Sequence, residues 1–209
     1  MKVIRLEVGQ MKANCYLVID EKHDSLLVID PGDDAEYITR IISDLSAKPE
    51  AILITHGHFD HLLAATDLKL IYNIPIYMDK EDEFLLNNME KSVKHYLNLD
   101  SPPRPQVDHY LENTHLTIGN FNIKIVKTPG HTPGSVSLYI EDAKCIFVGD
   151  VIFNNGYVGR YDFKYSNKEK LFESIDTILT LPKETVVYPG HDTSTDIASL
   201  KKLFSSSKS

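Results

Sequence analysis

The chain has 209 residues, 42% hydrophobic and 25% charged, an ordinary globular composition that excludes collagen-like and low-complexity classes. Its 22 basic and 30 acidic side chains give a net charge of −8 without a long Lys or Arg run, which disfavours nucleic-acid and anionic-membrane partners. No apolar stretch reaches about 18 residues, and Cys15 and Cys145 are too few for a disulfide framework. We expect no signal peptide and a single domain over residues 1–209 in the cytoplasm.

Apolar runs predict three strands near the N-terminus, at 3–8, 15–19 and 26–29. Asp33 and Asp34 then provide N-cap carboxylates for a helix that ends near Ser46. The same signals predict two more strands and two more helices before the middle of the chain: strand 51–55, helix 60–72, strand 76–78 and helix 79–97. The proline-rich segment 98–106 is expected to be a loop.

The second half of the chain shows the same order of predicted elements, strands first and then helices alternating with strands. Five strands come first, at 107–111, 114–118, 121–127, 135–140 and 144–148. A helix over about 167–181, a strand at 185–188 and a last helix ending near Phe204 follow, and the tail 205–209 is expected to fray. Because each half runs strands first and then alternates strands with helices, we predict an α+β fold with two sheets face to face and helices outside.

Four predicted strands end in short glycine-containing loops that carry His or Asp. The segments are Thr55–His61 (THGHFDH), Thr128–His131 (TPGH), Val148–Asp150 (VGD) and Tyr188–His191 (YPGH). Loops at strand ends are where a rigid sheet can aim side chains at one point. The glycine before His131, Asp150 and His191 lets the backbone turn without an obstructing side chain. We therefore expect the four loops to build one site.

The residue types in these loops indicate a metal centre. Neutral imidazole and carboxylate suit Zn²⁺, Fe²⁺ or Mn²⁺, and no cysteine joins them. Seven such residues exceed the needs of one tetrahedral ion, but two ions that share a carboxylate could use them all: His56, His58, Asp60, His61, His131, Asp150 and His191. The other four histidines are expected to be ordinary surface residues: His23, His95, His109 and His115.

The segment Thr55–His61 resembles the metal-binding signature of the metallo-β-lactamase fold hydrolases, and the resemblance extends over residues 3 to 192. It implies a four-layer αβ/βα sandwich with a dinuclear site at one edge of the two sheets. The implied ligands of the first ion are His56, His58 and His131, and those of the second are Asp60, His61 and His191, with Asp150 bridging the two. Asp30 matches the family's early strand-end aspartate and is expected to orient a ligand imidazole from behind.

Within the superfamily, three segments are most similar to the glyoxalase II group, which hydrolyses thioesters such as S-lactoylglutathione: Asn14–Val18, Asp30–Gly32 and Thr128–Ser135. A bridging Asp150 argues against the β-lactamases proper. The longer glyoxalase II proteins continue into a helical domain that helps to bind glutathione, and we expect this chain to be the short type without it. Arg160 lies near the family's basic substrate contact and is expected to bind substrate. Cys145 is expected to be a small core residue.

We therefore expect a dinuclear-metal hydrolase of S-lactoylglutathione or a related small acyl thioester, with Asp60 as a ligand that could also accept a proton. Two ions, zinc first and otherwise iron or manganese, would activate a shared water and polarise the carbonyl. Three alternatives stay open: a persulfide dioxygenase with a single iron, a lactone or phosphodiester hydrolase on the same fold, and a binding module with a vestigial site. RNA-processing relatives are disfavoured by the net charge of −8.

Overall fold

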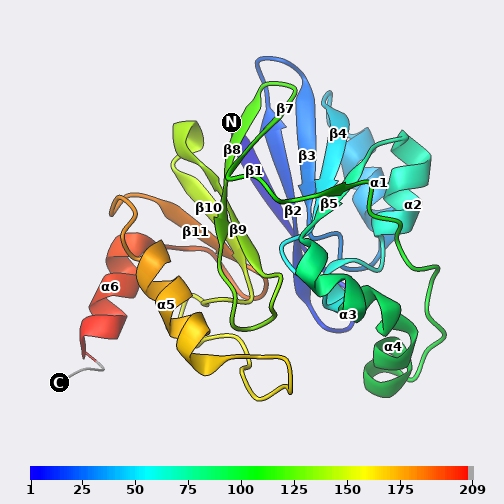
Figure 1. Ribbon diagram of the computed structural model, residues 1–209. Helices are drawn as coiled ribbons and strands as arrows, with labels where there is room; N and C mark the ends of the chain where they lie inside the picture. Colours follow the sequence, from blue (N-terminus) through cyan, green and yellow to red (C-terminus); the bar gives the residue numbers. More distant parts are fainter. Residues whose placement is uncertain (207–209) are drawn as a thin grey trace.

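Two six-stranded mixed sheets face each other in the computed structural model, which describes residues 1–206 (Figure 1). The first sheet has the order β1-β2-β3-β4-β5-β6. Its strands are β1 (Lys2–Val8), β2 (Ala13–Asp20), β3 (Ser25–Ile29), β4 (Lys48–Leu53), β5 (Ile76–Met78) and β6 (His109–Tyr110). β1 to β3 pair antiparallel, and β3 to β6 pair parallel.

The second sheet has the order β12-β11-β10-β9-β8-β7. Its strands are β7 (His115–Ile118), β8 (Phe121–Lys127), β9 (Val136–Ile140), β10 (Cys145–Gly149), β11 (Val186–Pro189) and β12 (Thr195–Asp196). β10 and β11 pair parallel, and the other neighbours pair antiparallel. The first sheet thus comes from residues 2–110 and the second from residues 115–196.

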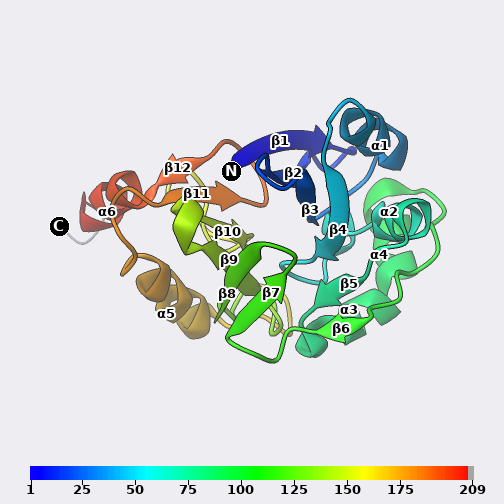
Figure 2. The same cartoon turned by 90° about the horizontal axis from the view of Figure 1, so that it is seen from above.

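Helices cover the outer face of each sheet, as Figure 2 shows from above. The first sheet is covered by α1 (Ala35–Ser43), α2 (Ala65–Tyr72), α3 (Glu83–Asn87) and α4 (Met89–Leu97). The second is covered by α5 (Lys168–Ile178) and α6 (Ile197–Ser206). Within the described residues, three short 3₁₀ turns complete the elements, at Phe59–His61, Lys80–Asp82 and Glu141–Ala143. The predicted α+β, four-layer αβ/βα sandwich is confirmed.

Burial on both sides explains why the central strands are continuous apolar runs. Side chains alternate along a strand, so Leu17 of β2 packs in the core under the helices, whereas Tyr16 and Val18 pack between the sheets. A third core lies between the second sheet and its helices. Both cysteines are free and buried, and Cys145 belongs to the core between the sheets, as predicted.

The predicted helix 60–72 is wrong in its first part. The chain makes a 3₁₀ turn at Phe59–His61 and becomes α-helical only at Ala65. The reason is that the N–H groups of Leu63 and Ala64 donate to the carbonyls of Gly32 and Pro31 in the loop after β3. The break therefore fixes the turn that carries Asp60 against the first sheet.

Two other helix predictions also need correction. The predicted helix 79–97 is divided into a 3₁₀ turn, α3 and α4, with non-helical backbone at Asn88. Asp33 and Asp34 do not cap α1 with their side chains, because Asp34 has a left-handed backbone (φ 54°) and its carboxylate accepts from the N–H of Gly9. β6 is shorter than the predicted strand 107–111, and β12 was not predicted.

Among the helices of residues 1–206, none combines the length and the apolar character that crossing a bilayer requires. The tail expected to fray is 205–209, but α6 continues to Ser206, and residues 207–209 lie outside the described part. The single-domain organisation over residues 1–209, without a glutathione-binding helical domain, stays a prediction.

Candidate metal centre

The four histidine- and aspartate-bearing loops meet at one edge of the two sheets. They follow β4, β8, β10 and β11. Backbone hydrogen bonds join them across the sheets: the N–H of Val136 donates to the carbonyl of Thr55, and that of Asn14 to the carbonyl of Gly190. The loops that sequence analysis placed in one site therefore do come together, and the backbone holds them there.

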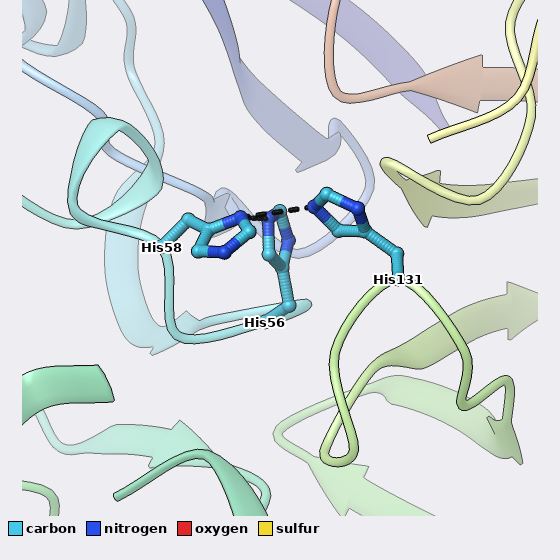
Figure 3. A group of neighbouring side chains, drawn as sticks. All are labelled: His56, His58 and His131. Carbon is cyan, nitrogen blue, oxygen red and sulfur yellow. Dashed lines mark hydrogen bonds between the residues drawn. The ribbon is translucent and has the colours of Figure 1, made fainter. Parts of the chain in front are cut away.

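A first group of three imidazoles faces a common point (Figure 3). Nδ1 of His58 lies 3.1 Å from Nε2 of His56 and 2.9 Å from Nε2 of His131. His56 and His58 come from the loop after β4, and His131 comes from the loop after β8 in the other sheet. The three inward nitrogens form a set of donors that could hold one metal ion.

A second group consists of Asp60, His61 and His191. Oδ2 of Asp60 lies 3.4 Å from Nε2 of His191 and 3.8 Å from Nε2 of His61. Asp150 stands between the two groups, because its carboxylate oxygens lie 3.6 to 3.7 Å from Nε2 of His61, His131 and His191. Its position is that of a carboxylate able to reach two neighbouring ions.

Each of the five histidines bonds to the protein through its outer ring nitrogen and turns the other nitrogen inward. The outer contacts are His56 Nδ1 to Thr55 Oγ1 (3.2 Å), His58 Nε2 to the Tyr165 hydroxyl (2.8 Å), His61 Nδ1 to Asp30 Oδ2 (3.2 Å), His131 Nδ1 to the Arg160 carbonyl (2.8 Å) and His191 Nδ1 to the Lys12 carbonyl (3.2 Å). A carbonyl or carboxylate oxygen only accepts, so it fixes the proton on the outer nitrogen of a neutral ring. In the neutral forms of His61, His131 and His191, the inner lone pair is then free for a cation.

Buried atoms without partners show that a cation fits this site. Within residues 1–206, Nε2 of His61 and Oδ1 of Asp150 are both buried and have no hydrogen-bond partner. They face each other at 3.6 Å, beyond hydrogen-bond distance. Orphaned buried polar atoms are rare because each one carries a desolvation cost. A metal ion near both atoms would satisfy them.

The protonation states of the imidazoles agree with this reading. Burial, followed by the neighbouring imidazoles, lowers the pKa of His56 and His58, to about 3 for His58. These rings are therefore neutral near pH 7, which is the form that binds metal. Burial also disfavours a charge on His61, but Asp60 and Asp150 outweigh it and raise the pKa of His61 to about 10. The carboxylates thus draw positive charge to this point.

Two glycines keep the strand ends close to the ligands. Gly149 has a left-handed backbone (φ 52°), and a Cβ atom there would lie 2.4 Å from Oγ1 of Thr55. A Cβ atom on Gly190 would lie 2.2 Å from Oδ1 of Asp150. The predicted reason for these glycines, which was room for the backbone beside the site, is confirmed.

Asp30 contacts the candidate ligand His61 on the side away from the other inward nitrogens. Its Oδ1 accepts from the Thr55 N–H at 2.7 Å, and its Oδ2 accepts from the Thr55 hydroxyl at 2.6 Å and lies 3.2 Å from Nδ1 of His61. Asp30 is 1% exposed and has a left-handed backbone (φ 49°). Such strain is held only where the surroundings fix it. His23, His95, His109 and His115 are exposed, as predicted.

Asp82 is a residue that sequence analysis missed. Its side chain is fully buried and accepts from the N–H of Gly57 (2.8 Å), the N–H of Gly134 (2.7 Å) and the hydroxyl of Thr132 (2.7 Å). It therefore joins the loop of His56 and His58 to the loop of His131. In the sequence it belongs to an acidic run, Asp79–Glu83, that reads as a solvated helix face, so no local signal marks it.

A cavity of about 430 Å³ opens beside the inward nitrogens, within the range of small-ligand pockets. Arg160 lines it, but its guanidinium makes two hydrogen bonds of 2.9 Å to Asp162. Its carbonyl holds His131. Tyr165, which sequence analysis also missed, lines the same cavity and contacts His58.

Residues 8–191 match the model of the metallo-β-lactamase superfamily. The chain belongs to the metallo-β-lactamase superfamily. Among curated members, it is similar to a probable metallo-hydrolase, YqgX, of Bacillus subtilis (37% identical over 94% of this chain and 93% of that protein). It is also similar to the hydroxyacylglutathione hydrolase GloC of Haemophilus influenzae (32% identical over 97% and 96%).

Solved structures of superfamily members show the same fold. The BLEG-1 B3 metallo-β-lactamase superimposes with a TM-score of 0.90, at 31% identity over 96% of this chain and 97% of that one. TTHA1623 in a di-iron-bound form superimposes with a TM-score of 0.86, at 32% identity over 95% and 96%. The superfamily fold thus holds two iron ions in one relative.

Proposed function

We propose that this protein is a dinuclear-metal hydrolase of small acyl thioesters. The observation that carries the proposal is the inward convergence of five imidazoles, each fixed by an outer hydrogen bond, around the carboxylate of Asp150. We assign His56, His58 and His131 to one ion, Asp60, His61 and His191 to the other, and Asp150 to both. Asp30 holds His61 from behind. Zinc is the metal we propose first, with iron next because of the di-iron relative.

Two divalent ions at these ligands supply Lewis acidity toward a carbonyl and lower the pKa of a water molecule. The role of the chain's own residues is to hold the imidazole rings in place. Thr55, Tyr165 and the carbonyls of Arg160 and Lys12 fix the rings, and the two sheets enclose them. Because a thiolate is a good leaving group, no strong protein acid is required beside the cavity.

Asp60 is better suited to hold a metal ion than to accept a proton. Burial alone would raise its pKa, but His61 and the hydrogen bond to His191 hold the pKa of Asp60 well below its usual range. Asp60 is then ionised at neutral pH and only weakly basic. Proton acceptance by Asp60 is therefore the lesser of its two proposed roles.

The thioester is favoured by the GloC relative, whose name specifies a hydroxyacylglutathione hydrolase. A β-lactam is the second candidate substrate, because of the likeness to the BLEG-1 β-lactamase. A lactone would use the same carbonyl chemistry. A single-iron dioxygenase stays a further alternative, in which the second group, Asp60, His61 and His191, would hold no ion.

The decisive experiment combines elemental analysis with a substrate panel. The metal-loaded protein should carry two ions per chain and hydrolyse S-lactoylglutathione or a simple acyl thioester faster than a chromogenic cephalosporin. Asp150→Ala should lose at least one ion and nearly all turnover, because both groups lose their shared carboxylate. Asp142→Ala, which removes an exposed carboxylate, is the matched control. One ion at saturating metal, or full turnover by Asp150→Ala, would contradict the proposal.

A further inference from the structure

The cavity beside the candidate ligands is built mainly from apolar and aromatic side chains. Five aromatic rings line it: Phe59, Tyr96, Phe153, Phe163 and Tyr165. They come from the turn after β4, from α4 and from the long loop after β10, so three separate parts of the chain supply the same kind of surface. Aromatic surfaces of this kind bind apolar groups by burial and by ring packing.

This aromatic wall begins at the imidazoles themselves. The rings of Phe163 and Tyr165 are stacked, with centroids 5.2 Å apart and planes at 12°. Phe163 also lies edge-on to His58 at 5.4 Å and to His131 at 6.3 Å. A substrate carbonyl held at the inward nitrogens would therefore place the group attached to it directly against Phe163.

Apart from the candidate metal ligands, few charged side chains line the cavity. Of the residues that line it in the described part of the chain, Arg160 is the one with an ammonium or guanidinium group. Nε and Nη2 of Arg160 donate to the two carboxylate oxygens of Asp162, each at 2.9 Å, and the guanidinium lies 4.3 Å over the Phe163 ring. Its charge is thus already compensated by a bidentate partner.

Glutathione is poorly matched to such a wall. It carries two carboxylates and an ammonium group, and specific recognition of these groups requires charged or hydrogen-bonding partners that are free to turn toward them. An uncharged ring or alkyl group instead gains binding free energy by burying its apolar surface against the aromatic side chains of the cavity. In this structure the Arg160 guanidinium pairs with Asp162 and lies over Phe163, and its expected role as a substrate contact stays a prediction.

We propose that this cavity selects thioesters that carry an uncharged apolar group, of about the size of a phenyl ring, next to the reacting carbonyl, and that glutathione is not its specific thiol. This inference rests on the proposed thioester hydrolysis. Phe163 is the residue that we expect to determine the preference, because it lies between Arg160 and the imidazoles.

The test compares kcat/KM of the metal-loaded, full-length protein for four substrates. S-acetyl-N-acetylcysteamine is the reference, S-phenylacetyl-N-acetylcysteamine adds a ring on the acyl side, S-benzyl thioacetate adds a ring on the thiol side, and S-acetylglutathione adds the charged thiol. At least one aromatic thioester should exceed the reference by about tenfold or more, whereas S-acetylglutathione should stay within about threefold of it. The two aromatic substrates show which side of the carbonyl faces the wall.

Variants connect the preference to the wall. Phe163→Ala should reduce the aromatic advantage to about threefold or less, and Tyr157→Ala should preserve it, because Tyr157 is 74% exposed and does not line the cavity. The inference would be overturned if both aromatic thioesters had the same kcat/KM as S-acetyl-N-acetylcysteamine. It would also be overturned if the kcat/KM of S-acetylglutathione exceeded that reference by more than about tenfold.

Inactivity toward all four thioesters would instead remove the proposed function. Calorimetry then measures binding to the cavity without catalysis, with phenylacetamide, acetamide and glutathione as probes. Binding of phenylacetamide in preference to the other two would support an apolar cavity. Binding of glutathione alone would overturn it.

Discussion

Tyr165 illustrates how one side chain outside the histidine- and aspartate-bearing loops can orient a residue of the candidate metal centre. Its hydroxyl lies 2.8 Å from Nε2 of His58, and its ring is fixed between Phe163 and Phe84. Burial raises the pKa of Tyr165, so the phenol stays neutral and can share a hydrogen bond with the imidazole. Partners of this kind orient metal-binding histidines.

Replacing Tyr165 should therefore weaken metal binding without unfolding the protein. Tyr165→Phe keeps the ring and removes the hydroxyl, and we expect metal affinity to fall by about tenfold. Competition with a chromogenic chelator measures the change. Tyr161→Phe, an exposed tyrosine of the same loop, is the control and should bind as the unmodified protein does. Equal affinities for the two variants would show that the hydroxyl has no role in orienting His58.

The protonation of His61 predicts how metal binding depends on pH. The pKa of His61 is raised from 6.5 to about 10, so the ring is charged in the metal-free protein at pH 7. This group stabilises the metal-free fold fully below pH 6.5, and that contribution is lost as the pH rises through about 10. A metal ion needs the neutral ring and must displace the proton.

Metal binding at pH 7 should therefore release at least one proton per chain, and the affinity should increase as the pH rises from 7 toward 9. Titration calorimetry in two buffers with different ionisation enthalpies measures the released protons. The same binding enthalpy in both buffers would contradict this assignment of His61.

At the scale of elements, the 3₁₀ turn Lys80–Asp82 does more than connect β5 to α3. It carries Asp82 into the interior, where three donors from two loops converge on one carboxylate. Burial raises the pKa of Asp82, and the three hydrogen bonds oppose that shift. The turn therefore sets the distance between the loop of His56 and the loop of His131.

Asp82→Ala should lower the free energy of unfolding of the metal-free protein by about 3 kcal/mol or more, because buried N–H groups lose their acceptor. Metal affinity should fall as well, since the two loops are no longer joined. Asp82→Asn keeps one acceptor oxygen and should lose less of both. Urea unfolding and metal titration give the two quantities, with Glu81→Ala as an exposed control. A variant that loses stability but keeps its metal affinity would limit Asp82 to a structural role.

For the whole molecule, the candidate metal centre lies between the two sheets and takes residues from both. His56, His58, Asp60 and His61 follow a strand of the first sheet, whereas His131, Asp150 and His191 follow strands of the second. A bound metal ion therefore stabilises the packing of the two sheets as well as the loops themselves.

Removal of metal should therefore lower the melting temperature. Free metal at about 1,000 times its dissociation constant adds about 4 kcal/mol, or about 10 °C for a chain of this size. Calorimetry of the metal-loaded protein with and without a chelator measures the difference, and re-addition of metal should restore it. An unchanged melting temperature would argue against a metal site that spans both sheets.

Much of the fold and the site can be predicted from the sequence because their signals are local. Runs such as residues 15–19 are apolar at every position because both faces of the strand are buried, and this burial identifies central strands. The seven histidines and aspartates follow strand ends, so the sheets were expected to bring them together. Helix boundaries were less predictable, because the break at Leu63 and Ala64 depends on carbonyls of Pro31 and Gly32, distant in sequence.

The α+β sandwich, the metal-binding residue types and the loops that carry them can be inferred from the amino-acid sequence. Three contacts become visible in the folded chain: Asp82 joins two of those loops, Tyr165 contacts His58, and Arg160 pairs with Asp162 beside the aromatic wall. The reason is the separation in sequence over which each signal acts. Periodic burial and loop glycines leave a pattern within a few residues, whereas the partner of a buried carboxylate or an imidazole is set by how two sheets from opposite halves of the chain pack.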